Sequence, residues 1–130
     1  MKKDYLYHGS PVKVDKLLPN QACDTEYNEG CQYAVYATSN KMMAILFALG
    51  CVSDFVDYER IMMPEYGNKM IFRNCHPNYD KKGYVYVLDK SKFNKHAMGS
   101  QWVCYEEVIP DSIEEINVND YLEYCIIQNC

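Results

Sequence analysis

The apolar positions near the N-terminus alternate with polar or amphipathic ones, as in a strand with one buried face. Leu6 lies between two tyrosines, and the stretch Asp4–His8 is therefore predicted to be a strand that Gly9-Ser10-Pro11 ends. Val12–Gln32 is interrupted by proline, asparagine, glycine and acidic residues, so it is predicted to be mostly loop. The short apolar run Tyr33–Ala37 then predicts a buried strand.

The next segment has the composition of a helix that is apolar around most of its circumference. It runs over Lys41–Leu49 and is expected to stop near Gly50. Thr38, Ser39 or Asn40 is expected to cap it, since short side-chain oxygens accept hydrogen bonds from the first free backbone N–H groups. A second short helical piece is predicted over Val52–Tyr58.

The remainder of the chain contains several more short strand-like runs. A hairpin or protruding loop is expected where a turn-forming segment separates Ile61–Met63 from Met70–Phe72. Strands are predicted at Tyr84–Leu88, at Gln101–Tyr105 with Val108–Ile109 as an extension, and at Ile113–Val118. A single helical turn is predicted at Asp89–Phe93, and a short final helix, capped by Asn119 or Asp120, is predicted to end at Tyr124. Many short strands with one solid helix predict an α+β fold, here a single domain over residues 1–130.

The composition and charge of the chain limit the compartment in which the protein is expected and the partners that it is expected to bind. The formal net charge of −5 lacks the excess of cations that neutralises phosphates, and it favours a protein over a nucleic acid as macromolecular partner. The longest nearly apolar run, Met42–Val52, is too short to span a bilayer, so no membrane partner is expected. Met1–Tyr5 is charged without an apolar stretch behind it, which predicts no signal peptide and a cytoplasmic protein.

Seven cysteines are present, and none forms a C-x-x-C pair. In a reducing cytosol they are expected to be mostly free thiols, several of them buried as small apolar residues. Because zinc sites use characteristic ligand spacings that this chain lacks, no metal site is expected.

Three local features combine residue types that suit a nucleotide site. They are His8-Gly9-Ser10 at a strand end, Tyr36-Ala37-Thr38 before the helix that carries Phe47, and Glu106-Glu107 after the strand of Trp102. An imidazole can hydrogen-bond a ribose hydroxyl, a glycine backbone can approach a planar amide, and an aromatic face can stack on a base. A carboxylate can stabilise a sugar cation like that of glycoside hydrolysis. Each feature alone is more typical of a surface histidine, of core aromatics or of a solvated strand end, and it is their joint order that favours a nucleotide site.

Taken in order, the three features resemble the ADP-ribosyltransferase superfamily, on its histidine-tyrosine-glutamate branch, which includes poly-ADP-ribose polymerases and diphtheria toxin. Tyr7–Ser10 resembles the His-Gly-Ser/Thr motif of that branch. Val35–Ser39 with Ala44–Ala48 resembles its second block, in which a strand enters a helix beside the nicotinamide. Trp102–Ile109 resembles its third block, a strand that bears the catalytic glutamate. The resemblance covers the chain from Tyr5 to about Val118 and implies two small packed mixed β-sheets around a cleft for NAD, which is the substrate.

The resemblance also implies a role for each matching residue. His8 would bind the adenine-side ribose, Gly9 would hold the nicotinamide amide through its backbone with help from Ser10, and Tyr36 or Phe47 would stack on the nicotinamide, with Thr38 in the same site. Glu106 would bind the nicotinamide-side ribose and stabilise the cation, with Glu107 as the competing choice. Adjacent strand residues face opposite ways, so only one of the two can do this.

The chain also departs from the family's pattern. Many relatives have a tyrosine in the helix that stacks on the nicotinamide, whereas this chain has Phe47 or Leu46 there. The insertion Cys51–Pro77 has no recognised counterpart in the family and is a candidate target-binding loop. A tRNA 2′-phosphotransferase is disfavoured, since such enzymes hold phosphate with several arginines and this chain has two, Arg60 and Arg73. Two alternatives stay open: an NAD glycohydrolase, and an inactive module that binds a partner through a tyrosine-rich face.

Overall fold

A computed structural model describes residues 4–21, 33–63, 65, 67–95 and 101–128 of the chain. Its larger sheet is antiparallel throughout, in the order β7-β8-β3-β1-β6-β9, with β2 added to β3. Its strands are β1 (Tyr5–Ser10), β2 (Asn20–Gln21), β3 (Tyr33–Thr38), β6 (Lys82–Asp89), β7 (Asn94–Lys95), β8 (Gln101–Cys104) and β9 (Ser112–Asn117). The two strands that carry the first two motif blocks, β1 and β3, are therefore neighbours at the centre of the sheet.

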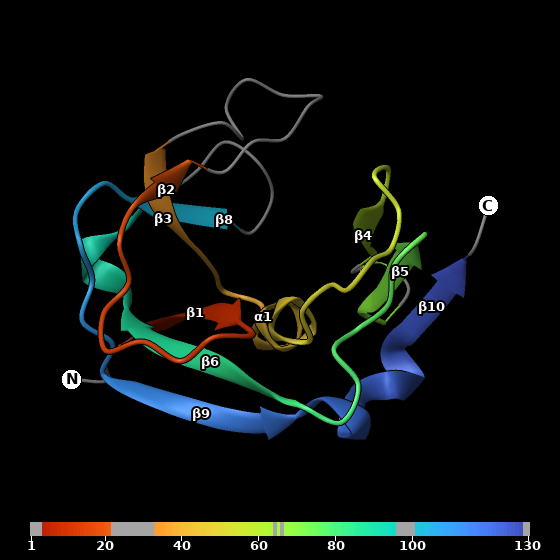
Figure 1. Cartoon of the computed structure of the whole chain (residues 1–130). Coiled ribbons are helices and arrows are strands. Elements are labelled where there is room, and N and C mark those ends of the chain that lie inside the picture. The colour runs from red at the N-terminus through yellow and green to blue at the C-terminus, as the bar shows by residue number, and fades with distance from the viewer. Residues whose placement is uncertain (1–3, 22–32, 64, 66, 96–100, 129–130) are drawn as a thin grey trace.

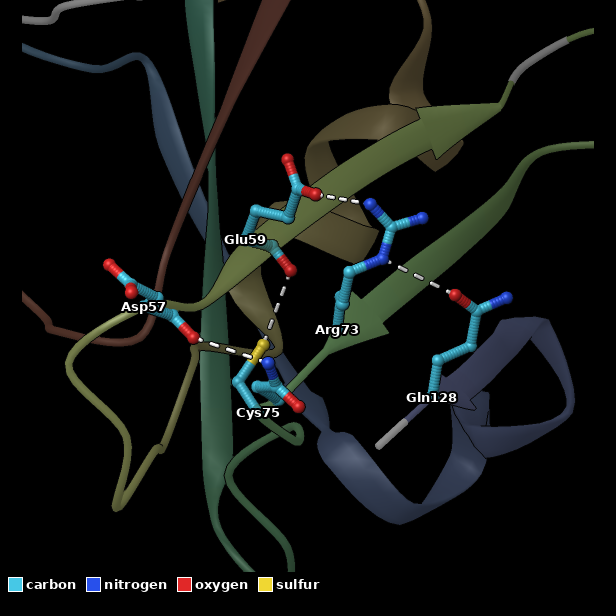
Figure 2. Close-up of polar contacts among 6 residues, drawn as sticks. Asp57, Glu59, Arg73, Cys75 and Gln128 are labelled. Atoms are coloured by element: carbon cyan, nitrogen blue, oxygen red, sulfur yellow. Dashed lines mark hydrogen bonds and ion pairs between the residues drawn. The ribbon is translucent and has the colours of Figure 1, made fainter. Parts of the chain in front are cut away.

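The smaller sheet contains three strands in the order β10-β5-β4. β4 (Glu59–Met63) and β5 (Lys69–Arg73) form an antiparallel hairpin, and β10 (Cys125–Gln128) pairs with β5 in parallel. The Arg73 side chain joins all three strands, because its Nη1 forms an ion pair with Glu59 on β4 and its Nε donates to Gln128 Oε1 on β10 at 3.4 Å (Figure 2).

Helix α1 (Lys41–Ala48) lies between the two sheets, with β1, β6 and β9 on one side and β4, β5 and β10 on the other (Figure 1). Its residues Ala44, Ile45 and Ala48 pack with Val85 of the larger sheet. On the other side, Leu46 and Leu49 pack with apolar residues of the smaller sheet, among them Met70 and Phe72. The helix thus supplies the apolar layer that holds the two sheets together.

The ends of α1 follow from local chemistry. The Oδ1 of Asn40 accepts a hydrogen bond from the Met43 N–H at 3.2 Å, so Asn40 is the cap among the three predicted residues. At the other end, Gly50 has a φ of +76°, in the left-handed region that favours glycine and ends helices.

The coarse prediction of an α+β fold with two sheets and short helices is confirmed. Mixed pairing is found in the smaller sheet, whereas the larger sheet is antiparallel throughout its described strands. The predicted hairpin is β4–β5, and the predicted strands and helix over residues 33–37, 41–49, 84–88 and 113–118 are found within two residues at each end. The turn at Asp89–Phe93 is the 3-10 helix η3 (Lys90–Lys92). The last helix is the 3-10 helix η4 (Val118–Tyr124), which has no side-chain cap. Most of the predicted loop over residues 12–32 lies outside the described residues.

Two predicted boundaries are wrong because tertiary contacts outweigh the local signal. Gly9 and Ser10 do not end the first strand, since they pair with Val85 and Tyr84 of β6. Val108 does not extend β8. It exchanges backbone hydrogen bonds with Leu17 at 2.9 and 2.8 Å instead.

The predicted second helical piece is also wrong, and the strand β10 was not predicted. Val52 forms a β-bridge with His76, and the Ser53 hydroxyl donates to the Asn74 carbonyl oxygen at 2.5 Å, which holds residues 52–58 in a non-helical course. The 51–77 insertion therefore contributes the β4–β5 hairpin to the fold rather than forming only a loop. Within the described residues, no helix is both long and apolar enough to cross a bilayer.

Candidate functional site

His8 on β1 is joined directly to Tyr36 on β3. The Nδ1 of His8 lies 2.6 Å from the carbonyl oxygen of Tyr36. A carbonyl oxygen only accepts, so Nδ1 carries the proton, and in the neutral ring Nε2 is then left with a lone pair. The first two motif blocks therefore meet at one point, and the His8 ring presents a hydrogen-bond acceptor there.

The surroundings of His8 favour its neutral form. Burial lowers the pKa of His8 below its ordinary value, and the hydrogen bond to Tyr36 opposes this shift only in part. His8 is accordingly uncharged near neutral pH. An uncharged imidazole can accept a hydrogen bond from a hydroxyl group through Nε2, which an imidazolium cannot do.

The ladder between β1 and β3 consists of the single pair Tyr7–Thr38. Continued in the same antiparallel register, it would place Gly9 opposite Tyr36. The Tyr36 carbonyl oxygen instead accepts from the His8 side chain, while Gly9 and Ser10 stay paired with β6 on their other edge. The two central strands thus separate beside His8, at the residues that the first motif block contains.

Gly9 is packed against the backbone of helix α1. A Cβ atom at position 9 would lie 1.7 Å from the Ala44 carbonyl oxygen and 2.9 Å from the Ala48 nitrogen. Only glycine fits there without a shift of the helix or the strand. The Ser10 hydroxyl accepts from the Val12 N–H at 3.1 Å, which turns the chain after β1.

The candidates of the second block, two on β3 and one on α1, have different surroundings. Thr38 is buried, and its hydroxyl oxygen accepts from the Asn40 N–H at 3.0 Å, so its clearest role is to lead β3 into α1. Tyr36 is half-buried. Phe47 packs with the cluster of the smaller sheet, and the Arg60 guanidinium lies over its ring, 5.3 Å from the centroid. His8, in contrast, contacts residues of the larger sheet.

The two glutamates follow β8, which is the strand on the other side of β3. Val103 pairs with Tyr36, and Glu106 comes three positions later in an exposed segment. The Glu107 carboxylate forms an ion pair with Lys16 at 3.1 Å. Glu106 is engaged through its backbone, where its carbonyl oxygen accepts from the Cys104 thiol at 3.6 Å. Of the two carboxylates, that of Glu107 thus has a cationic partner among the described residues.

Tyr86 on β6 belongs to this neighbourhood, and sequence analysis did not single it out. Its ring centroid lies 6.0 Å from that of His8. Its hydroxyl donates to the Val12 carbonyl oxygen at 2.7 Å and accepts from the Val14 N–H at 2.8 Å. Burial raises the pKa of Tyr86, so the phenol stays protonated and able to donate. Its alternation with Tyr84 and Leu88 marks a core-facing position, and this pattern does not reveal the contact with residues 12–14.

The cysteines and other ligand types do not gather into a metal site within the described ranges. No group of three or more His, Cys, Asp or Glu side chains is placed to hold an ion there. Cys51, Cys75, Cys104 and Cys125 are free thiols. The other three cysteines lie outside the described residues.

Comparison with protein-family models, with curated proteins and with solved structures finds no match to this chain.

Proposed function

We propose that this protein is an ADP-ribosyltransferase that consumes NAD and releases nicotinamide, with an ADP-ribosyltransferase-like fold whose NAD cleft opens where β1 and β3 separate. The observation that carries the proposal is the bond between His8 and Tyr36, which unites the first two motif blocks and orients the His8 ring. The third block begins on the next strand, β8, where Val103 lies opposite Tyr36, and its two glutamates follow the end of that strand. The three blocks are therefore borne by adjacent strands in the order β8-β3-β1.

In this proposal each group of the site acts on a different part of NAD. The His8 Nε2 accepts a hydrogen bond from a hydroxyl of the adenine-side ribose. The backbone of Gly9, assisted by Ser10, holds the nicotinamide amide, and the Tyr36 ring stacks on the nicotinamide. The tyrosine is a better candidate for stacking than Phe47, whose ring is covered by the Arg60 guanidinium.

The chemical step breaks the bond between the ribose anomeric carbon and the nicotinamide nitrogen. The bonding electron pair leaves with nicotinamide, and the sugar becomes an oxocarbenium-like cation. A nucleophile of the acceptor then bonds to the anomeric carbon and loses its proton. The carboxylate of Glu106 stabilises the developing positive charge, since a carboxylate held beside such a cation lowers the barrier electrostatically.

Glu106 is favoured over Glu107 by their different partners. The ion pair with Lys16 partly neutralises the Glu107 carboxylate, whereas Glu106 is held through its backbone. The two residues are adjacent and both are exposed, so they form a matched pair for mutation.

The arginines favour a protein acceptor over phosphate chemistry on nucleic acid. Arg60 donates to the carbonyl oxygens of Phe47 and Gly50 at 3.3 and 3.5 Å. Arg73 is bound by Glu59 and Gln128. Both side chains are therefore engaged by partners within the protein, Arg60 at the end of helix α1 and Arg73 in the smaller sheet, which disfavours a role in clamping a phosphate group. The net charge of −5 points the same way.

A binding module without catalysis is the second candidate function. It is favoured by the exposed apolar side chains of residues 52–58, where Val56 is 96% exposed. The others are Val52, Phe55 and Tyr58. In such a module the exposed segment would be the recognition surface, and the NAD reaction would be absent.

Nicotinamide release from NAD by the purified chain tests the proposal, with cell lysate as the source of acceptor. We expect turnover in the wild type and in Glu107→Ala, and a loss of at least tenfold in Glu106→Ala and in His8→Ala. With NAD labelled in its ADP-ribose part, transfer of the label to lysate proteins would identify a transferase. Release of nicotinamide without any labelled protein would identify an NAD glycohydrolase. No release by the wild type, together with no change of its melting temperature on addition of NAD, would contradict the proposal and favour the binding module.

A further inference from the structure

Four large apolar side chains are exposed together in the segment between helix α1 and strand β4. They belong to residues 52–58, and the two at its centre, Phe55 and Val56, are 54% and 96% exposed. Val52 and Tyr58, at its two ends, are exposed as well. Single exposed apolar residues are ordinary on a protein surface, whereas several that are contiguous are typical of a surface that binds a partner.

This exposed segment is held in a fixed course by residues that follow strand β5. At its start, Val52 and His76 exchange two backbone hydrogen bonds of 2.8 and 2.9 Å. The Ser53 hydroxyl donates to the Asn74 carbonyl oxygen at 2.5 Å. Further along, the Asn74 Nδ2 donates to the Asp57 carbonyl oxygen at 3.4 Å (Figure 2). The segment therefore presents its side chains without the entropy cost of ordering a free loop, which favours binding.

The same segment carries two exposed carboxylates. Asp54 and Asp57 lie between its apolar residues, and neither forms an ion pair within the described part of the chain. The carboxylate of Glu59, just beyond the segment, differs because Arg73 pairs with it. Figure 2 shows the Asp57 carboxylate directed away from the Arg73 side chain. The segment thus combines apolar surface with uncompensated negative charge.

We propose that residues 52–58 form a docking site for a basic and apolar segment of a protein partner. Lysine or arginine side chains of the partner pair with Asp54 and Asp57, while its apolar side chains cover Phe55 and Val56. Burial of the apolar side chains provides affinity, and the charges select the partner and accelerate the encounter. The net charge of −5 attracts a basic partner over a longer distance.

The two carboxylates argue against other occupants of this surface. In a symmetric contact between two copies of the chain, each copy would bring Asp54 and Asp57 against the same acidic segment, and the like charges would repel each other. An anionic lipid surface would be repelled for the same reason. The segment contains none of the residues assigned to NAD, so this inference does not rest on the proposed NAD reaction and is tested separately from it.

Selection from a displayed library of random linear peptides tests the site, with the full chain as bait. Peptides of about eight residues are long enough to span the segment. We expect the enriched peptides to combine lysine or arginine with leucine, isoleucine or phenylalanine, and to bind Val56→Ser much more weakly than the wild type. Enrichment of acidic peptides, of peptides without basic residues, or of peptides that bind Val56→Ser equally well would overturn the proposal. So would the absence of any enriched peptide.

Point variants separate the apolar contribution from that of charge. Fluorescence anisotropy of one enriched, labelled peptide should show affinity reduced about tenfold by Val56→Ser and about threefold by Asp57→Asn. Raising the salt concentration should weaken binding to the wild type more than binding to Asp57→Asn. The matched controls are Ile109→Ser and Glu123→Gln, which change an exposed apolar and an exposed acidic side chain outside the segment. A control that weakens binding as much as its matched variant would place the site elsewhere and overturn the proposal.

Two further measurements exclude a folding defect and a second copy of the chain as explanations. Because the Val56 side chain is almost fully exposed, Val56→Ser should have the melting temperature of the wild type. Sedimentation equilibrium of the wild type at increasing concentration should show no self-association that Val56→Ser abolishes. Such self-association would make a second copy the occupant of the surface and would overturn the assignment to a basic partner.

Discussion

Gly9 and Ala44 are packed so closely that a Cβ atom on Gly9 would lie 1.7 Å from the Ala44 carbonyl oxygen. Strand β1 and helix α1 can approach each other in this way only because position 9 has no side chain. Gly9→Ala should therefore force strand and helix apart and lower the free energy of unfolding by roughly 1–3 kcal/mol, as other overpacked sites do. Urea denaturation of the two proteins measures the difference, and an unchanged midpoint would contradict the packing described.

Gly83→Ala is the control that separates stability from ligand binding. A Cβ atom on Gly83 would lie 2.3 Å from the Ala48 carbonyl oxygen, so this variant should also be destabilised. Gly83 lies on β6 and carries no role in the proposed NAD site. Under conditions where both variants are folded, Gly9→Ala alone should lose the thermal shift that NAD produces.

The pattern of residues correctly predicted those features that depend on contacts between residues close together in the sequence. The cap at Asn40 and the end at Gly50 are local, and both are found where expected. The strand boundaries at Ser10 and Cys104 depend on partners distant in the sequence, Tyr84 and Val35, and local signals do not contain them. For the same reason β10 was not predicted, since it is a strand through its pairing with β5.

Tyr86 should stabilise the protein through its hydroxyl group. This fully buried side chain bonds the Val12 carbonyl oxygen and the Val14 N–H, and it is the partner through which residues 12–14 are held against β6. Tyr86→Phe leaves those two backbone groups without this partner, which typically costs about 1–3 kcal/mol. Thermal and urea unfolding measure the loss. Tyr84→Phe, at a partly buried position on the same strand, should cost clearly less, and equal losses would argue against the special role of Tyr86.

Stability should depend on pH through His8. Burial lowers the pKa of His8 in the folded protein, whereas the unfolded chain binds this proton near pH 6.5. The contribution is therefore fully present above about pH 6.5 and is lost as the pH falls through the folded pKa of His8. Urea unfolding between pH 7 and pH 5 should show a steeper loss of stability in the wild type than in His8→Asn. Parallel profiles for the two proteins would exclude His8 as the source.

The candidate site could be predicted only in part, because several of its contacts join residues that are far apart in the sequence. The order of the motif blocks pointed to His8 and Tyr36, and the fold joins these two residues. Nothing in the sequence shows that the His8 ring bonds a backbone carbonyl, that Lys16 pairs with Glu107, or that Arg60 covers Phe47. These contacts form between segments separated in the chain, and they distinguish Glu106 and Tyr36 from their neighbours.

Asn40 is expected to connect the start of helix α1 to the β4–β5 turn, and two substitutions separate its contacts. Its Oδ1 accepts from the Met43 N–H at 3.2 Å, and its Nδ2 donates to Asn68 Oδ1 at 2.8 Å. Asn40→Ala removes both contacts and should lower the free energy of unfolding by about 1 kcal/mol or more. Asn40→Asp keeps the cap and adds a negative charge at the helix N-terminus, which partly offsets the lost bond to Asn68. Urea midpoints should therefore follow the order wild type, Asn40→Asp, Asn40→Ala, and equal midpoints for the two variants would show that the Asn68 contact, rather than the cap, stabilises this junction.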